Sequence, residues 1–463
     1  MAIGQYLECF KAYDVRGRVP DQLNPVLAEF IGRAFARLIR PRRVAVGRDV
    51  RLTSPELAQR LSQGLVDSGV DVLDIGVVGT EEVYFAVASL GLDGGVMVTA
   101  SHNPRDYNGM KFTREQARPI SADTGLAQME EITMEMLRQD GNVHWAPPQS
   151  RGARGKVTSV DLRAQYVEHS LTYVDQTKLR PLKLVVNAGN GGAGPVIDLL
   201  EAELPFRFVK IFHDPDGSFP NGVPNPMLPE TRAVTAQTVV SEQADLGLAW
   251  DGDFDRCFFF DEKGGFVEGY YLVGLLAERA LRRHPGAAII HDPRLVWNTI
   301  ELVEAAGGRP VVSKSGHAFI KEKMREVDAA YGGEMSAHHY FKEFGYCDSG
   351  MIPWLEVVQA LCEAGRPLSE LVAERIARYP VSGEINLVLA DPSSALSAVR
   401  ARYGPEAVRV QEIDGLSFEF PTWRFNVRPS NTEPVVRLNV ETRGDVALLD
   451  RVTQEVIAVL KGA

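Results

Sequence analysis

The chain has 463 residues, of which 45% are hydrophobic and 24% are charged, the composition of an ordinary folded protein rather than a disordered one. Its net charge of −11 argues against a nucleic-acid-binding surface. No apolar run approaches the roughly 20 residues of a membrane span, and the start lacks the features of a signal peptide. We therefore expect a cytoplasmic protein that binds neither nucleic acid nor membranes. A chain of this length predicts three or four domains.

The first part of the chain alternates between strand and helix patterns. Apolar strands are predicted at residues 44–46 and 71–77. Between them, a helix is predicted to start at Ser54-Pro55 and to stop near Gly69, because proline favours the first turn of a helix and glycine its end. This alternation predicts an α/β fold, with open sheets covered on both faces by helices.

An apolar strand at residues 96–98 runs directly into the loop Thr99-Ala-Ser101-His102-Asn103-Pro104. Small and turn-forming residues dominate this loop, which would present the hydroxyl of Ser101 at the end of a strand. An isolated Ser-His pair more often only caps a helix or turns the chain. The hypothesis of a reactive Ser101 therefore depends on the rest of the sequence.

Three carboxylates at alternate positions, Asp251, Asp253 and Asp255, follow the apolar strand at residues 245–250. Bare carboxylates about 4 Å apart repel by roughly 4 kcal/mol per pair at an effective dielectric constant near 20, so a divalent cation with oxygen preference is predicted, Mg²⁺ first. A helix-loop-helix calcium site has similar acidic spacing, but its sixth position requires glycine and here holds Arg256. Magnesium is therefore the favoured ion.

Two further patterns exclude other cofactors. The loop at residues 187–192 is rich in glycine but lacks the G-x-G-x-x-G spacing of a dinucleotide site, so a turn that packs a strand against a helix is predicted. The cysteines lack metal-ligand spacing, which predicts reduced thiols and no zinc site. The four cysteines are Cys9, Cys257, Cys347 and Cys362.

Shifts in composition predict the domain boundaries. Residues 147–155 are polar and rich in turns, residues 262–265 read as a hairpin turn, and a helix at residues 270–283 opens a new α/β unit. Beyond Ser382 the pattern changes to strands at 384–389, 417–420, 425–427 and 435–440 and a helix at 446–460, which predicts a smaller α+β domain. The predicted domains are residues 1–152, 153–260, 261–372 and 373–463.

Four motifs in chain order, together with a segment near the start, resemble those of the α-D-phosphohexomutase superfamily. They are Phe10-Lys-Ala-Tyr13-Asp-Val-Arg16-Gly17, the Ser101 loop, the aspartate loop from Asp251 to Arg256, Gly333-Glu334-Met-Ser336-Ala-His338, and Arg428-Pro-Ser430-Asn431-Thr432-Glu-Pro434. The Gly-Glu-Met-Ser form is most similar to that of bacterial phosphomannomutases/phosphoglucomutases. The resemblance implies three related α/β domains with mixed sheets covered by helices, and a smaller C-terminal α+β lid domain, around a central cleft.

The resemblance also implies an activity, the interconversion of hexose 1-phosphate and hexose 6-phosphate, with mannose and/or glucose as the sugar. Phosphorylated Ser101 gives its phosphate to the sugar, and the resulting hexose 1,6-bisphosphate turns around and returns its other phosphate to Ser101. The implied cofactors are Mg²⁺ and, as activator, glucose 1,6-bisphosphate or mannose 1,6-bisphosphate. The implied partners are small-molecule sugar phosphates, and relatives include monomers and homodimers.

Residue roles follow from the same resemblance. The implied catalytic residues are Ser101, His102, Lys111, Arg256 and His317. His317 or Lys111 is favoured as the general base, and His102 is expected to support Ser101. The implied metal ligands are Ser101, Asp251, Asp253 and Asp255. The implied substrate-binding residues are Tyr13, Arg16, Arg294, Ser315, Gly316, Glu334, Ser336, His338, Arg428, Ser430, Asn431 and Thr432.

Two departures from the family pattern leave the sugar preference open. Arg294 stands where relatives often have lysine, and Ala337 stands where bispecific members usually have glycine. Phosphoglucosamine mutase is the nearest competing activity, and it is disfavoured because glutamine typically stands at the position of Met335. Two functions of different classes also compete with the mutase: a metal-dependent sugar-phosphate phosphatase with a serine nucleophile, and a sugar-phosphate-binding protein without catalysis.

Overall fold

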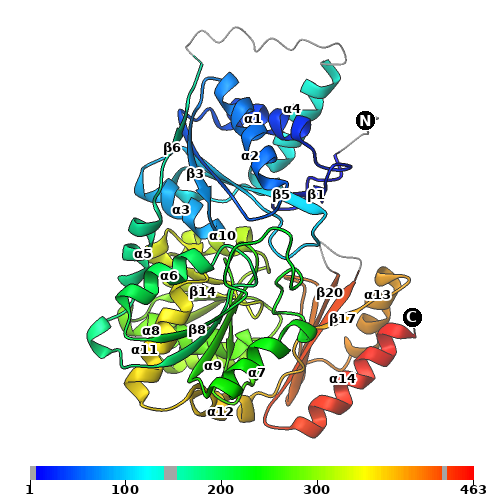
Figure 1. The fold of residues 1–463 in the computed structure, drawn as a ribbon. Coiled ribbons are helices and arrows are strands. Elements are labelled where there is room, and N and C mark those ends of the chain that lie inside the picture. Colours follow the sequence, from blue (N-terminus) through cyan, green and yellow to red (C-terminus); the bar gives the residue numbers. More distant parts are fainter. Residues whose placement is uncertain (1–6, 140–153, 430–434, 463) are drawn as a thin grey trace. The chain divides into compact units, whose positions relative to one another are not determined.

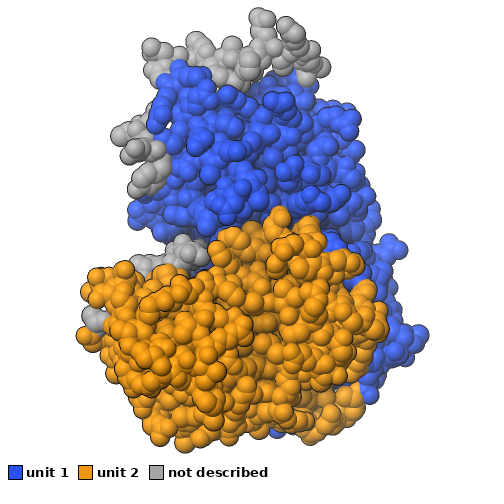
Figure 2. Space-filling model, turned by 180° about the vertical axis from the view of Figure 1, so that it is seen from behind, with its two compact units in different colours: residues 1–264, 343–363 blue, residues 265–342, 364–463 orange. Residues whose placement is uncertain are grey.

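The computed structural model describes residues 7–139, 154–429 and 435–462, and helices and strands alternate through most of them (Figure 1). The chain divides into two compact units (Figure 2). Unit 1 comprises residues 1–264 and 343–363, and unit 2 comprises residues 265–342 and 364–463. This architecture confirms the predicted α/β class with mixed sheets.

The first sheet of unit 1 is mixed and has the strand order β1-β5-β4-β2-β3-β6. Its strands are β1 (Val15–Arg18), β2 (Arg43–Arg48), β3 (Asp71–Val77), β4 (Gly94–Val98), β5 (Tyr107–Arg114) and β6 (Val157–Ser159). Strand β4 is buried along its whole length, as expected for a central strand covered on both faces. Strands β2, β3 and β4 run parallel, so the loops that follow them start at the same edge of the sheet.

Four helices pack on this sheet or on one another: α1 (Pro25–Ile39), α2 (Ser54–Asp67), α3 (Thr80–Ser89) and α4 (Leu126–Gln139). Helix α1 begins where the sequence favours it, because the side chain of Asn24 accepts a hydrogen bond from the N–H of Leu27 and Pro25 occupies the first turn. The buried faces of α1 and α2 join the strands in one hydrophobic core.

Unit 1 contains a second mixed sheet with the order β10-β9-β7-β8. Its elements are α5 (Arg163–Leu171), β7 (Lys183–Asn187), α6 (Gly194–Glu203), β8 (Arg207–Ile211), α7 (Ala233–Glu242), β9 (Leu246–Trp250) and β10 (Cys257–Phe260). Strands β7, β8 and β9 are parallel, and β10 returns antiparallel to β9. The β9-β10 connection therefore places residues 251–256 at the carboxyl edge of this sheet. Strand β16 (Cys347–Asp348) and most of α11 (Ile352–Ala364) complete the unit.

Unit 2 begins with a further α/β layer. Its elements are β11 (Phe266–Val267), α8 (Gly269–Arg283), β12 (Ala288–His291), α9 (Trp297–Ala305), β13 (Arg309–Val312), α10 (His317–Val327), β14 (Tyr331–Gly333) and β15 (His339–Phe341). Strands β13, β12 and β14 are parallel, and β15 pairs antiparallel with β14. The turn between β14 and β15 contains the Gly-Glu-Met-Ser motif. Helix α12 (Leu368–Arg378) follows.

The last part of unit 2 is an antiparallel sheet with the order β17-β21-β20-β19-β18. Its elements are β17 (Ile385–Leu387), α13 (Pro392–Tyr403), β18 (Arg409–Gln411), β19 (Leu416–Glu419), β20 (Trp423–Pro429), β21 (Val436–Thr442) and α14 (Val446–Lys461). Helices α13 and α14 contact each other and the sheet (Figure 1). They share a core with the strands, which confirms the predicted α+β domain.

Short 3-10 helices complete the secondary structure at Glu115–Ala117, Ala122–Thr124, Gln176–Lys178, Pro229–Thr231 and Lys342–Phe344. All four cysteines are free, as predicted. In the described parts of the chain, no helix combines the length and the apolar character that crossing a membrane requires. The predicted boundary at residues 147–155 falls largely outside the described residues.

Helices α1 and α2 approach each other so closely that two glycines are required at their contact. A Cβ atom added at Gly64 would lie 2.1 Å from the carbonyl oxygen of Glu29, and one at Gly32 would lie 2.3 Å from that of Leu61. These oxygens belong to helix backbones, so relief requires a shift of a whole helix.

We expect Gly64→Ala to destabilise the protein by about 2 kcal/mol, although alanine alone would favour the helix by up to about 1 kcal/mol. The free energy of unfolding in urea measures the change. Gln59→Ala, at an exposed position of the same helix, is the control and should change it by less than about 0.5 kcal/mol. A stability of Gly64→Ala equal to that of the control would contradict the close helix contact.

Candidate active site

The loop after β4 holds Ser101 in an unusual backbone conformation. Ser101 has φ of 49°, in the left-handed region that residues other than glycine seldom adopt. Its N–H donates to the Thr99 hydroxyl at 2.8 Å, and the N–H of Asn103 donates to the carbonyl of Ala100 at 2.9 Å. The tight turn buries Ser101, which is 4% exposed, and fixes the direction of its hydroxyl.

The Ser101 loop and the aspartate loop lie in direct contact, although 150 residues separate them in sequence. The Ser101 hydroxyl donates to Oδ2 of Asp251 at 2.7 Å. A Cβ added at Gly252 would lie 2.7 Å from the carbonyl oxygen of Ser101, so only glycine permits this approach. The juxtaposition predicted from the two motifs is therefore present within unit 1.

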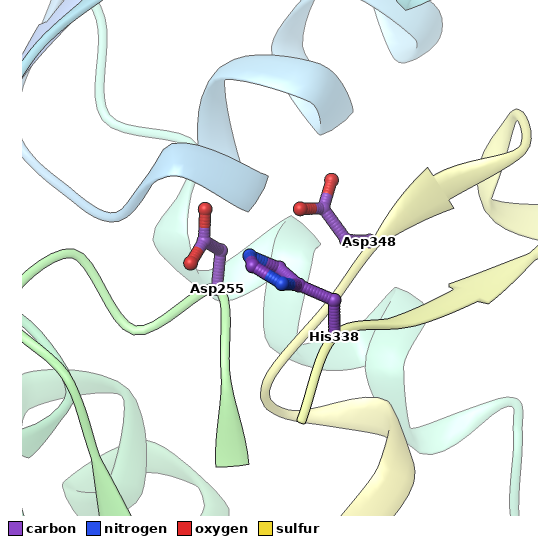
Figure 3. Close-up of side chains that lie close together, drawn as sticks. All are labelled: Asp255, His338 and Asp348. Carbon is purple, nitrogen blue, oxygen red and sulfur yellow. The ribbon is translucent and has the colours of Figure 1, made fainter. Parts of the chain in front are cut away.

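The three aspartates of the loop form a buried cluster with oxygen atoms within 4.8 Å of one another. Among the residues that the structure describes, Oδ1 of Asp251 and Oδ1 of Asp253 have no hydrogen-bond partner. Buried carboxylate oxygens without donors are costly, and this donor set matches the oxygen ligands that Mg²⁺ prefers. Asp348, on β16, adds a further carboxylate, with an oxygen atom within 4.8 Å of one of Asp255, and Figure 3 shows these two side chains close together.

Two buried cations offset the negative charge of this cluster. Nζ of Lys111 lies 2.7 Å from Oδ2 of Asp253 and 2.6 Å from Oδ2 of Asp255. Nη2 of Arg256 lies 2.6 Å from Oδ2 of Asp251. Burial opposes the charged form of Lys111, but the neighbouring carboxylates of Asp253 and Asp255 raise the pKa of Lys111 above its ordinary value. Lys111 is therefore a cation in this arrangement rather than a ready base.

Burial raises the pKa of Asp251 to about 6, and the nearby Arg256 limits the rise. A bound divalent cation would favour the ionised carboxylate and counter the effect of burial. Burial and a bound cation would thus shift the pKa of Asp251 in opposite directions, and the cation would offset the cost of burying this carboxylate.

His102 and Arg16 lie beside Ser101. Nδ1 of His102 is 3.0 Å from the Ser101 hydroxyl oxygen and accepts a hydrogen bond from Nη2 of Arg256. Burial and, next, the charge of Arg256 lower the pKa of His102 well below its usual value, so the imidazole is neutral. Arg16 donates to Oδ1 of Asn103 at 2.7 Å, which ties β1 to the Ser101 loop. Tyr13 lies half-buried just before β1.

The structure adds Thr80, which the motifs did not reveal. The Thr80 hydroxyl donates to Oδ2 of Asp253, and the Thr80 N–H donates to the Asp253 carbonyl at 3.1 Å. Thr80 follows β3, which is parallel to β2 and ends at the same edge as the Ser101 loop. Its place after a parallel strand is the one sequence signal that could have identified it.

The glycine-rich loop at residues 187–192 supports the aspartate loop. The N–H of Gly192 donates to the carbonyl of Gly252 at 3.1 Å, and a Cβ at Gly191 would lie 2.8 Å from that same oxygen. The predicted packing turn is therefore present. Its contact with the aspartate loop explains why the glycines are close together without dinucleotide spacing.

In unit 2, the Gly-Glu-Met-Ser motif forms the tight turn between β14 and β15. The N–H of Glu334 donates to the carbonyl of His338 at 2.9 Å. The carboxylate of Glu334 accepts hydrogen bonds from the Gly316 N–H at 2.9 Å and the Tyr340 hydroxyl at 2.6 Å. Nδ1 of His338 lies 3.4 Å from the same carboxylate. The turn is thereby linked to the loop that leads to His317, the first residue of α10.

Arg294 is buried beside this turn. Its guanidinium pairs with Asp292 at 3.0 Å, donates to the Ser336 hydroxyl at 3.1 Å and lies 3.3 Å from Glu384. Burial opposes its charge, but Asp292 and then Glu384 raise its pKa. Arg294 therefore orients Ser336, and its direct contact with substrate stays a prediction.

Arg428, at the end of β20, lies 3.7 Å from Asp414 and 3.9 Å from Glu384. Asp414 also accepts a hydrogen bond from the Ser315 N–H at 3.2 Å, so it links Arg428 to the loop before α10. Within the described residues, the buried Ser315 hydroxyl oxygen has no hydrogen-bond partner. The other residues predicted for this motif, Ser430, Asn431 and Thr432, lie outside the described part of the chain.

Family models match almost the whole chain. Residues 7–139, 164–265 and 268–379 match the phosphoglucomutase/phosphomannomutase α/β/α domains I, II and III, and residues 384–459 match the C-terminal domain of the same family. The four matches follow the chain in the order predicted from the motifs.

Full-length relatives agree with these matches. The chain is 58% identical over 459 residues to a phosphomannomutase of Salmonella montevideo, covering 98% of this chain and 99% of that protein. It is 57% identical over 456 residues to phosphohexose mutases of Xanthomonas campestris pv. campestris, covering 98% of this chain and 100% of the relative. A phosphoglucomutase/phosphomannomutase family protein from Burkholderia thailandensis has a similar crystal structure, with a TM-score of 0.85, 34% identity and coverage of 98% and 97% of the two chains.

The turn between β14 and β15 contains one residue whose side chain opposes its backbone conformation. Ala337 has φ of 70°, in the region that favours glycine. We expect Ala337→Gly to raise the free energy of unfolding by about 1 kcal/mol. Ala377→Gly, in the exposed part of α12, should lower it by about 1 kcal/mol. Urea unfolding measures both, and a loss of stability in Ala337→Gly would contradict the strain.

Proposed function

We propose that this chain, which belongs to the phosphoglucomutase/phosphomannomutase family, is a phosphohexomutase that interconverts the 1-phosphates and 6-phosphates of mannose and/or glucose. One observation carries the proposal: the Ser101 hydroxyl lies 2.7 Å from Asp251, inside a buried cluster of carboxylates and cations. The full-length relatives named as phosphomannomutases support mannose phosphates as substrates.

Ser101 serves as the carrier of the transferred phosphoryl group. Its phosphorylated form carries a charge of about −1.5 to −2 at neutral pH. Lys111 and Arg256 neutralise part of the negative charge of this phosphoryl group and of the aspartates. Phosphoryl transfer requires such neutralisation. His102 accepts the Arg256 hydrogen bond and keeps that guanidinium beside Ser101.

Asp251, Asp253 and Asp255, with phosphorylated Ser101, would hold Mg²⁺. The ion would supply Lewis-acid stabilisation of the charge that develops on the transferred phosphoryl group. Thr80 and Lys111 orient the carboxylates of this set through their contacts with Asp253.

Residues of unit 2 are the proposed binding residues for the sugar and for the phosphate that is not transferred. Glu334 accepts hydrogen bonds from sugar hydroxyls and Ser336 donates to them, in both orientations of the bisphosphate. Arg428 grips the phosphate that is not being transferred. The remaining residues proposed to contact substrate are Tyr13, Arg16, Arg294, Ser315, Gly316, His338, Ser430, Asn431 and Thr432.

His317 is the proposed general base for the attacking sugar hydroxyl. The second candidate, Lys111, is held as a cation between two carboxylates, which opposes proton uptake. A hexose 1,6-bisphosphate from solution serves as activator, because it can phosphorylate Ser101 before the first turnover.

We expect purified protein to isomerise mannose 1-phosphate when Mg²⁺ and glucose 1,6-bisphosphate are added, and Ser101→Ala to lower kcat by at least about 1,000-fold, since the phosphoryl carrier is lost. A coupled assay of mannose 6-phosphate formation measures both. Ser89→Ala removes a hydroxyl that donates to the helix carbonyl of Phe85 and should leave kcat unchanged.

The same assay separates the mutase from the competing activities. Release of inorganic phosphate without isomerisation would assign a phosphatase, and a preference for glucosamine 1-phosphate would assign the glucosamine activity. Failure of mannose, glucose and glucosamine phosphates alike to isomerise would refute the mutase proposal.

We expect Asp253→Asn to weaken Mg²⁺ binding by at least about 10-fold, because a carboxylate of the metal set loses its charge. Isothermal titration of the protein with Mg²⁺ measures the affinity without any turnover. Asp245→Asn, just before the opposite end of β9, is the matched control and should bind Mg²⁺ as the wild type does. Equal affinities in all three proteins would place the metal elsewhere.

A further inference from the structure

Arg51 is a buried cation that no motif of the chain includes. It is 1% exposed and lies just beyond β2. Strand β2 pairs in parallel with β4, with Arg48 opposite Val98, and the N–H of Asp49 donates to the Val98 carbonyl at 2.9 Å. The segments that follow these two strands therefore begin side by side, which places Arg51 next to the Ser101 loop.

The guanidinium of Arg51 donates four hydrogen bonds, all to backbone carbonyls, three in that loop and one at Tyr107, the first residue of β5. Nη1 donates to Pro104 at 2.7 Å and to Tyr107 at 2.9 Å. Nη2 donates to Ser101 at 2.9 Å and to Asn103 at 2.6 Å. One rigid, planar group thus fixes four peptide units between the start of the loop and the start of β5.

Arg51 is itself held in place. Its Nε lies 3.3 Å from Oδ2 of Asp49, and its own N–H donates to Oδ1 of Asp49 at 3.0 Å. The Ser54 hydroxyl also donates to Oδ1 of Asp49. The ring of Phe219 lies 5.4 Å from the guanidinium carbon. Asp49 therefore balances the charge of the Arg51 guanidinium, and these contacts hold the guanidinium in one orientation.

The loop needs such support at Ser101. A residue with a side chain opposes a left-handed φ, and it keeps one only when its surroundings determine it. Glycine would relieve the strain but would remove the hydroxyl. Because a trans peptide points its C=O and N–H in opposite directions, the bond from Arg51 to the Ser101 carbonyl also fixes the N–H of His102 away from Arg51.

We infer that Arg51 is a positioning residue for phosphoryl transfer, which holds the Ser101 loop in the conformation that directs the serine oxygen at Asp251 without itself touching the reacting groups. The inference rests on the proposed mutase function. It also predicts that positive charge alone is insufficient, since a lysine ammonium offers one nitrogen and cannot span four carbonyls.

The test compares Arg51→Lys with Arg33→Lys in the full-length protein. Arg33 is also buried in unit 1 and pairs with Glu29 and Asp67, away from the loop. We expect Arg51→Lys to lower kcat and the rate of Ser101 phosphorylation by glucose 1,6-bisphosphate by about 100-fold, with KM changed by less than about 3-fold. Arg33→Lys should leave both rates within about 2-fold of the wild type.

Hydrogen exchange supplies a readout that does not depend on activity. Amides of residues 99–108 should exchange faster in Arg51→Lys than in the wild type or in Arg33→Lys, while amides of β2 and β3 stay protected. Asp49→Asn, which loosens Arg51 but leaves it in place, should produce smaller changes of the same kind and serves as the second variant if Arg51→Lys does not fold.

The outcomes distinguish a failure of the Arg51 inference from a failure of the proposed mutase function. Equal kcat losses in Arg51→Lys and Arg33→Lys, or unchanged exchange at residues 99–108, would overturn the role of Arg51. A wild-type protein that neither isomerises hexose phosphates nor accepts a phosphoryl group on Ser101 would instead overturn the proposed function, and the exchange comparison would still decide whether Arg51 orders the loop.

Discussion

The contact between the Ser101 hydroxyl and the Asp251 carboxylate, at 2.7 Å, is the constraint on which the rest of unit 1 depends. It brings the proposed phosphoryl carrier into a cluster of carboxylates, and a phosphate on Ser101 would repel these carboxylates unless cations intervened. Lys111 and Arg256 supply part of that compensation, and the oxygen-rich set supplies a site for a divalent ion. The chemistry of the Ser101 loop and that of the aspartate loop can therefore be interpreted only together.

Sheet topology produces this contact. Strands β2, β3 and β4 end at one edge of the first sheet and β9 ends at an edge of the second, and the contacts of Ser101 and Thr80 with the aspartate loop show that the loops at these carboxyl ends meet. Glycines at 191 and 252 then allow backbone to approach backbone where any side chain would collide. The site is built from short loops on rigid strands, which limits their freedom to move apart.

The sequence predicted the candidate residues that lie in continuous motifs. Ser101 and Asp251 each follow a strand that a strong apolar pattern marked, whereas Glu334 was identified from its motif alone and the short strand before it, β14, was not predicted. Strand β18 and helix α13 were missed, because β18 is short and exposed and α13 has a weak apolar face. Arg51 and Thr80 were missed for another reason: their roles arise only from pairing between distant strands, which no local spacing records.

The cations proposed to contact phosphate already have carboxylate partners in the structure. Lys111 and Arg256 in unit 1 and Arg428 in unit 2 each pair with carboxylates, so a phosphate that binds to any of them, as proposed, would have to share or displace those partners. Its net binding free energy is smaller than a bare guanidinium would give, because the carboxylate contacts are lost or weakened. In the proposed mechanism a weaker grip would suit a bisphosphate intermediate, which has to release both ends and rebind in the opposite orientation, whereas unpaired cations would slow that release.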